Sequence, residues 1–294
     1  MRKEMIASVS EHIKNNKCSS LFLVDIGVFA FRDILEKYPD RVLNIGIFED
    51  GMISVAAGLA LGGIEPTIYG ISPFIVDRAL EQLKLDFAYQ NLGGNFITTG
   101  AAYDFSTLGY SHYCPEDIGV LYNLPGFEFI APGTGEEFSI LYKSCVSNGN
   151  PTYYRLSDYD NKNSQNVTFG KANVIKKGDR AIVIAVGTML DAVIEAVNDL
   201  DVTILYYTTL LPFDTDSIKK FNKTGEIIVC EPEYIGSLDS MIISSLEGEF
   251  LRLSHVGIPR KILRNYGSKE EKDFYCKLTA KDIRNTVMHI LTKE

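Results

Sequence analysis

Residues 46–60 read GIFEDGMISVAAGLA and join an expected strand at 42–47 to an Ala-rich helix expected at 52–61. The many small residues suit a helix that packs closely against its neighbours. Glu49 and Asp50 lie at the junction, and open parallel sheets bind ligands at the edge where their strands end. Two interpretations stay open at this point: a ligand-binding pair, or solvated acids that favour the N-terminus of a helix.

Short apolar runs alternate with amphipathic stretches along the rest of the chain, which predicts an α/β fold of mostly parallel sheets flanked by helices. Further strands are expected at 20–25, 67–70, 96–99 and 128–131 and, in the second half, at 180–186, 202–206 and 227–230. Helices are expected at 79–89, 190–199 and after Ser237.

A polar segment divides this pattern. Residues 157–166 read SDYDNKNSQN, which contains turn-forming residues and no aliphatic side chain. We therefore predict two domains: a first domain at 1–160, a linker at 161–169 and a smaller second domain at 170–294.

Composition excludes several classes of protein. The chain has 294 residues, 46% of them hydrophobic, and a formal net charge of −9, which is the wrong sign for a nucleic-acid or acidic-membrane binder. No apolar run is long enough to cross a membrane, and the N-terminus lacks the pattern of a signal peptide. Five scattered cysteines without a CxxC suggest neither a disulfide framework nor a zinc site, and they favour a reducing cytoplasm.

Common catalytic motifs are also absent from the sequence. There is no P-loop and no GxSxG elbow, and the GxG at 133–135 lacks the third glycine of a dinucleotide fingerprint. The four histidines fall at no metal-ligand spacing, so we expect no metal site on this chain. Besides Glu49 and Asp50, the remaining candidate is His112 in a loop rich in Gly and Tyr.

Six ordered motifs, taken together, resemble the C-terminal half of transketolase, and the resemblance covers nearly the whole chain. These motifs are GIFEDGMISVAAGLA at 46–60, Asp25 after the first strand, YPDR at 38–41, the set Phe74, Arg78-Ala79 and Glu81-Gln82, DFAYQNL at 86–92, and GYSH at 109–112 with EDI at 116–118. Phe48 departs from the usual family residue at its position. In the second half, IAVGT at 184–188 and LLPFD at 210–214 are similar to the transketolase C-terminal domain, and Glu231 matches a family glutamate.

The resemblance implies an enzyme that uses thiamine diphosphate to carry a two-carbon unit between small sugars. It implies that Glu49 is catalytic and binds the pyrimidine ring nitrogen of the cofactor, and that His112 is catalytic and contacts the substrate carbonyl. Phe74 would stack on the aminopyrimidine, and Asp25 and Arg78 would also belong to the cofactor site. The structural alternatives are core packing for Phe74, a structural imidazole for His112 and a turn residue for Asp25.

One half of the expected cofactor site is missing. The chain has no Gly-Asp-Gly followed about 25–30 residues later by Asn, the family signature for holding Mg²⁺ and the diphosphate through oxygen ligands. The resemblance therefore implies one subunit of a split transketolase. A separate N-terminal-type chain would supply the Mg²⁺ and diphosphate site, and the two chains would form an α₂β₂ assembly.

Departures from the family bear on the substrate. Leu108 stands where many transketolases have an aspartate, and Asp158 stands where they have a phosphate-binding arginine. A carboxylate at position 158 would repel a sugar phosphate, which disfavours the ordinary pentose-phosphate substrates. Arg155 is either a substitute for that arginine or a buried pairing residue. The rival interpretations are the β-type subunit of a 2-oxo acid dehydrogenase, a 1-deoxyxylulose-phosphate-synthase-like enzyme and a non-catalytic assembly subunit.

Overall fold

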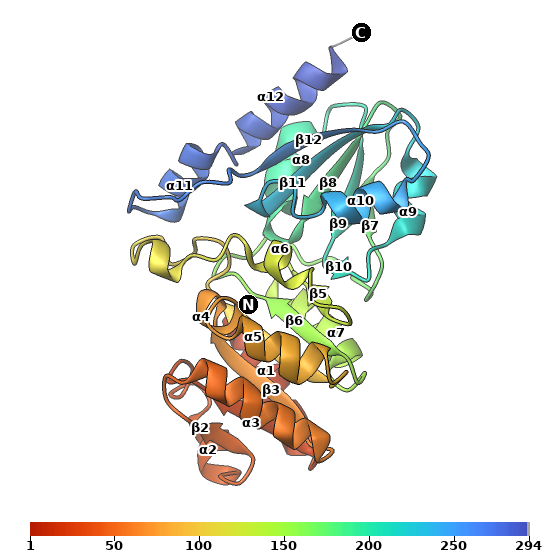
Figure 1. Ribbon diagram of the computed structural model, residues 1–294. Coiled ribbons are helices and arrows are strands. Elements are labelled where there is room, and N and C mark those ends of the chain that lie inside the picture. The colour runs from red at the N-terminus through yellow and green to blue at the C-terminus, as the bar shows by residue number, and fades with distance from the viewer. Residues whose placement is uncertain (293–294) are drawn as a thin grey trace.

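The computed structural model describes residues 1–292 and contains two sheets, one for each half of the chain (Figure 1). The first sheet has the spatial order β2 (Val42–Asn44), β1 (Ser19–Leu23), β3 (Glu65–Ile71), β4 (Gly94–Thr99), β6 (Pro151–Arg155), β5 (Glu128–Ile130) and β10 (Thr209–Leu211). Its strand pairs are parallel, except that β10 runs antiparallel to β5.

The second sheet has the order β12 (Arg252–Ile258), β11 (Glu226–Tyr234), β8 (Ile182–Val186), β9 (Thr203–Tyr207) and β7 (Asn173–Lys176). Here β7 is the antiparallel edge strand, and the other pairs are parallel. Both sheets are thus mostly parallel, which confirms the predicted fold class.

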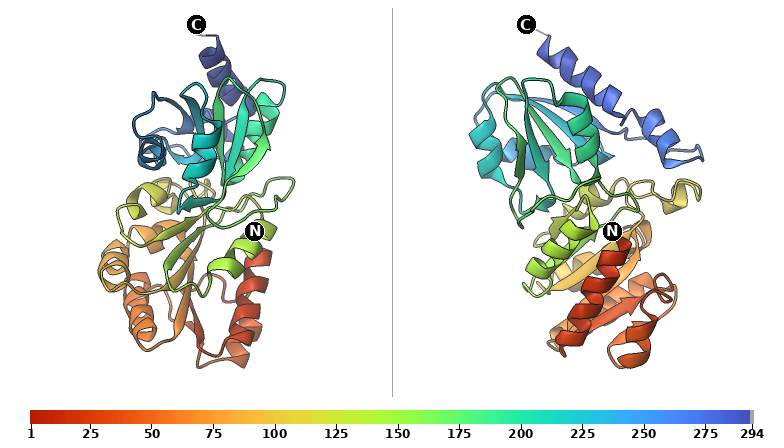
Figure 2. Two further views of the ribbon diagram at one scale, coloured as in Figure 1. Left: turned by 90° about the vertical axis from the view of Figure 1, so that its right-hand side faces the viewer. Right: turned by 180° about the vertical axis from the view of Figure 1, so that it is seen from behind.

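Helices cover both faces of each sheet (Figure 2). On the first sheet, α1 (Arg2–Asn15) and α7 (Gly135–Cys145) lie together on one face, and α3 (Glu49–Leu61), α4 (Ser72–Val76), α5 (Leu80–Gln82) and α6 (Asp117–Leu121) lie on the other. On the second sheet, α8 (Leu190–Val197) and α12 (Ala280–Leu291) oppose α9 (Thr215–Phe221) and α10 (Asp239–Ser245). The short helices α2 (Arg32–Lys37) and α11 (Lys269–Cys276) lie outside these layers. No helix in the described residues is long and apolar enough to cross a membrane.

Several element boundaries differ from the prediction. The strand expected at 42–47 ends at Asn44, because Gly46 has a φ of 76° and turns the chain toward α3, which already begins at Glu49. The strand expected at 20–25 ends at Leu23, and Asp25 adopts a left-handed φ of 65°. The helix expected at 79–89 is α5 followed by a π-helical segment, Leu83–Ala88, in which the Tyr89 N–H bonds to the Lys84 carbonyl.

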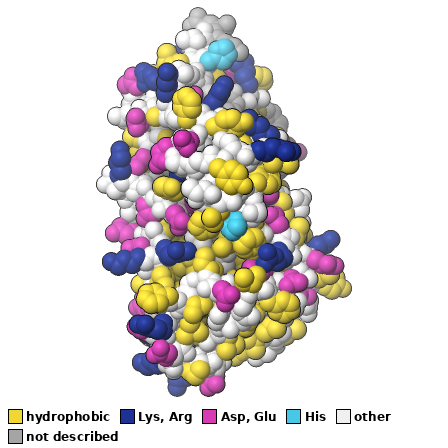
Figure 3. Space-filling view, turned by 90° about the vertical axis from the view of Figure 1, so that its left-hand side faces the viewer, with side chains coloured by type: hydrophobic (Ala, Val, Ile, Leu, Met, Phe, Trp, Pro, Cys, Tyr) yellow, Lys and Arg dark blue, Asp and Glu magenta, His cyan; other side chains and the backbone are white. Residues whose placement is uncertain are grey.

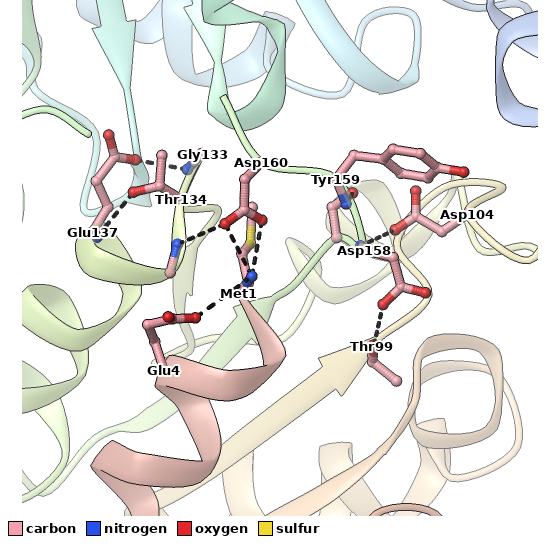
Figure 4. A network of polar contacts seen from close by, with 12 residues as sticks. Met1, Glu4, Thr99, Asp104, Gly133, Thr134, Glu137, Asp158, Tyr159 and Asp160 are labelled. Atoms are coloured by element: carbon pink, nitrogen blue, oxygen red, sulfur yellow. Dashed lines mark hydrogen bonds and ion pairs between the residues drawn. The ribbon is translucent and has the colours of Figure 1, made fainter. Parts of the chain in front are cut away.

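The predicted linker is anchored at its first residue, while Lys162, Asn163, Asn166 and Thr168 are exposed. Asn161 is buried, and its backbone N–H donates to the Gly133 carbonyl at 2.8 Å while its side-chain amide donates to the Gly187 carbonyl at 3.0 Å. The Asp160 carboxylate nearby accepts the Gly135 N–H (Figure 4). Asn161 thus bonds to both halves of the chain, and β10 adds a strand from the second half to the first sheet. The domain boundaries themselves stay a prediction.

Candidate functional site

The residues predicted for the site all follow strands of the first sheet at their carboxyl ends. Asp25 follows β1, Glu49 follows β2, Phe74 and Arg78 follow β3, and His112 follows β4. The strand order reverses between β1 and β3, because β2 lies on one side of β1 and the later strands lie on the other. Such a reversal leaves a crevice at the carboxyl edge where ligands of α/β sheets bind.

Glu49 is the first residue of α3, and its side chain is only 2% exposed. The N-terminus of a helix favours a negative charge, because the first backbone N–H groups point toward it. The turn at Gly46 brings the helix start to the sheet edge, so a carboxylate is held in the interior directly at the crevice.

Arg78 joins Glu49 to Phe74. Its Nη1 lies 2.5 Å from Glu49 Oε2, and its guanidinium carbon lies 4.4 Å from the centre of the Phe74 ring. Because Arg78 is 41% exposed, it covers the buried carboxylate from the solvent side. The structure therefore brings these three predicted residues together, and any contact of Arg78 with a cofactor stays a prediction.

His112 also contacts Phe74. The two rings meet edge to face with centres 5.3 Å apart, and Phe105 lies 6.4 Å from the imidazole in a similar arrangement. Ser111 Oγ is 3.0 Å from His112 Nδ1, so a hydroxyl that donates there leaves the proton on Nε2. Phe74 and Phe105 therefore give the imidazole apolar neighbours. Figure 3 shows one face of the molecule, on which hydrophobic side chains are interspersed with charged ones.

Asp25 is separate from this group. Its carboxylate accepts from the Asn44 amide at 2.9 Å, and its own N–H donates to Asn44 Oδ1 at 2.9 Å. It lines a cavity of about 290 Å³ with Arg2, Phe29 and Tyr69. The reciprocal bond to Asn44 explains how a non-glycine residue keeps a left-handed backbone here.

Arg155 is a buried pairing residue and cannot replace a phosphate-binding arginine. It is 4% exposed, its Nε donates to Asp117 at 2.8 Å, and its Nη1 lies 3.7 Å from Glu233 of the second half. Of the two interpretations of Arg155, the phosphate-binding one is therefore wrong, because the guanidinium is enclosed and its charge is already compensated. Sequence patterns offer little signal for this network, since its members are far apart in the chain.

Two carboxyl groups near the site were not singled out from the sequence. Burial, followed by the charge of Asp117, raises the pKa of Asp77 to about 6. Burial raises the pKa of Glu116 to about 7, and the neighbouring carboxyls Asp77 and Asp117 add to the shift. In sequence, Asp77 precedes Arg78 and Glu116 follows the His112 loop.

The carboxyl end of β4 also carries acids rather than a cation. Asp158 Oδ1 lies 3.4 Å from the Thr99 hydroxyl, and the Asp158 N–H donates to Asp104 at 2.9 Å (Figure 4). Burial raises the pKa of Asp104 to about 7. This arrangement disfavours a phosphate at the position where Asp158 stands.

The residues present suit the ring of an aminopyrimidine better than a metal-bound diphosphate. A buried carboxylate beside a half-buried aromatic ring offers a polar contact and an apolar face. Within residues 1–292, no cluster of three or more His, Cys, Asp or Glu side chains is arranged to hold a metal ion.

Comparisons with known proteins identify the family of the chain. The family model described as transketolase, pyrimidine binding domain, matches residues 11–160, and the one described as transketolase, C-terminal domain, matches residues 170–273. An uncharacterized 33.6 kDa protein in the fasciation locus of Rhodococcoides fascians is 34% identical over 97% of this chain and 92% of its own length. One subunit of the apulose-4-phosphate transketolase of Actinobacillus succinogenes is 26% identical, covering 76% of each chain.

Among solved structures, a split gene transketolase described as an inactive beta4 tetramer has a TM-score of 0.88 at 23% identity and covers 99% of this chain and 98% of its own. The transketolase of Campylobacter jejuni has a TM-score of 0.79 at 16% identity, and this chain spans 46% of it. These structures show the same fold. The chain therefore belongs to the transketolase family, as a pyrimidine-binding domain followed by a transketolase C-terminal domain, which is the composition of the C-terminal subunit of a split transketolase.

Proposed function

We propose that this chain is the C-terminal subunit of a thiamine-diphosphate-dependent enzyme that transfers a two-carbon ketol unit from a ketose to an aldehyde. The observation that carries the proposal is the buried Glu49 carboxylate at the start of α3, which Arg78 joins to Phe74, with His112 next to that ring. A subunit that only completed an assembly would have no need for a buried acid at the carboxyl edge of the sheet.

Each of these residues has a defined task in this proposal. Thiamine diphosphate, when bound, supplies the carbon nucleophile that attacks a ketose carbonyl. Glu49 shares a proton with the pyrimidine ring nitrogen, and because Arg78 occupies Oε2, Oε1 is the oxygen left for that contact. Phe74 provides an apolar face for the ring. His112 donates from Nε2 to the oxygen of the substrate carbonyl, with Ser111 holding the other ring nitrogen.

A partner chain completes the site. The outer face of α3 and the residues before it expose Ile47, Phe48, Val55 and Leu61, each more than half exposed. A Cβ built at Gly58 on the same helix meets nothing within 4 Å. An open apolar face of this kind is typical of a protein interface. We propose that an N-terminal transketolase-type subunit lies here and holds the diphosphate and Mg²⁺, in an α₂β₂ assembly.

The proposed substrates are small sugars of a specialised carbohydrate pathway. The acids Asp104 and Asp158 at the edge of β4 support acceptors without a phosphate on this side of the site. A cytoplasmic location is part of the proposal, and the five free cysteines support it.

The test begins with calorimetry of thiamine diphosphate and Mg²⁺, on this chain alone and mixed with a candidate N-terminal-type subunit. We expect binding only in the mixture. Tight binding by the isolated chain contradicts the shared site, and no binding in the mixture favours the non-catalytic alternative. Offering pyruvate-type acids beside ketoses separates ketol transfer from the 2-oxo acid dehydrogenase interpretation, and activity with ketoses alone supports ketol transfer.

A substitution in the mixture tests the role of Glu49. Glu49→Gln keeps the size of the side chain but cannot share the proton, so we expect at least a tenfold loss of ketol transfer, or about 1.4 kcal/mol of barrier. Asp50→Asn is the matched control, because Asp50 follows Glu49 at the same helix start. Equal losses for both variants would mean that helix-end charge, and not proton sharing, explains the effect.

A further inference from the structure

The loop that carries His112 is closed on itself. It leaves β4 after Thr99, and its two ends meet in an isolated bridge between Ala102 and Cys114, with the Cys114 N–H donating to the Ala102 carbonyl at 2.7 Å. Inside the loop, the Tyr113 hydroxyl donates to the Ser106 carbonyl at 2.7 Å. Residues 102–114 therefore form a compact loop that is closed by its own hydrogen bonds.

A helix of the second half holds this unit from outside. Tyr103 donates its hydroxyl to Asp273 Oδ1 of α11 at 2.6 Å, across 170 positions of sequence. Asp273 is itself held by Lys269, whose Nζ lies 2.6 Å from Oδ2. A short hydrogen bond to a carboxylate is among the stronger polar contacts in proteins, so this one ties the loop to α11.

Lys272, the residue before Asp273, makes a second contact. Its side chain is buried, its Nζ lies 4.9 Å from the centre of the Tyr113 ring, and it donates to the Asn265 carbonyl. Burial lowers the pKa of this lysine. A buried ammonium over an aromatic face is attracted to it, and here that face belongs to the neighbour of His112.

A third contact reaches the turn that precedes His112. Gly109 has a φ of 88°, and its carbonyl accepts the His112 N–H at 3.0 Å. The Tyr266 ring lies so close that a Cβ on Gly109 would be 2.7 Å from it. Tyr266 thus packs directly against the backbone that sets the position of the imidazole.

We propose that α11 with Tyr266 positions the His112 loop, and that Tyr266, Lys272 and Asp273 are positioning residues for His112. Figure 1 shows α11 beside the loop, on the same side of the molecule. The three contacts surround His112 in sequence, at Tyr103, Gly109 and Tyr113, and leave the imidazole free to face Phe74. The catalytic part of this inference rests on the proposed function, whereas the coupling of α11 to the loop does not.

Hydrogen exchange of the full chain tests the coupling and needs no activity assay. Asp273→Ala removes the acceptor, and we expect amide exchange in residues 101–113 to rise about tenfold, the fold-change for one hydrogen bond to a charged group, while β1 and β8 stay unchanged. Tyr103→Phe removes the same hydrogen bond from the loop side. It keeps the test valid if Asp273→Ala fails to fold. Glu270→Gln, an exposed acid of the same helix, is the control and should change nothing. Unchanged exchange in both Asp273→Ala and Tyr103→Phe overturns the proposal.

Kinetics of the assembled enzyme tests whether the coupling acts through His112. We expect Tyr103→Phe to lower kcat/KM about tenfold in the natural background and less than about twofold when His112→Ala is already present, because positioning has no effect once the imidazole is gone. Equal losses in both backgrounds overturn the positioning role. If no ketol transfer is found at all, the proposed function fails, and the exchange result still decides the coupling.

Discussion

Replacing Arg155 by Met should destabilise the protein far more than removing a surface cation. Arg155 and Asp117 are both buried, and their Nε–Oδ2 distance of 2.8 Å is that of a charge-assisted hydrogen bond. Methionine fills most of the volume but leaves Asp117 without its counter-ion in a dry interior. Breaking a buried pair from one side costs about 3–5 kcal/mol, because an uncompensated charge remains.

Urea unfolding at neutral pH measures this change. With an m value of about 3 kcal/mol/M, the unfolding midpoint should fall by about 1–1.7 M. Lys223→Met is the control, because its pair with Asp179 has a similar length, 2.5 Å, but both side chains are more than half exposed. Such a surface pair contributes about 0–1 kcal/mol.

The reasoning would be refuted by a loss below about 1 kcal/mol for Arg155→Met, equal to that of the control. A second variant identifies the cause. Adding Asp117→Asn to Arg155→Met should recover part of the lost stability, since the remaining buried charge is then removed. No recovery would assign the loss to packing instead.

Two further predictions concern pH and assembly. Burial raises the pKa of the Glu233 carboxyl to about 8 in the folded chain, from about 4.5 in the unfolded chain. The stability that this difference contributes is therefore complete below about pH 4.5 and is lost as the pH rises toward about 8. We expect the free energy of unfolding to fall between pH 5 and 8, and Glu233→Gln to flatten that fall in urea titrations at several pH values; an unchanged slope would contradict the assignment. Val55→Asp places a charge on the open face of α3 and should weaken binding to the N-terminal-type subunit at least tenfold in calorimetry, with the unfolding midpoint of the isolated chain unchanged. Undiminished binding would remove α3 from the interface.

Much of the local structure around Glu49 could be predicted from residues 46–60. A glycine, two acids and an Ala-rich run define a turn followed by a helix start, and these are preferences of neighbouring residues. Apolar periodicity likewise predicted parallel sheets, because buried strands and one-sided helices impose different spacings. The exact ends of the elements were less predictable, as at Asn44, since one backbone dihedral at Gly46 decides them.

By itself, the sequence determined the α/β class, most of the buried central strands and the family, since these depend on local pattern and ordered motifs. The strands β7, β10 and β12 were not among the expected ones. Only the tertiary structure decided which of those residues meet. It placed Arg78 on Glu49, buried Arg155 against Asp117, and brought α11 to the His112 loop across 170 residues. The physical reason is that such contacts depend on how the sheets and their connections pack in three dimensions. The residues next to a side chain in sequence do not determine that packing.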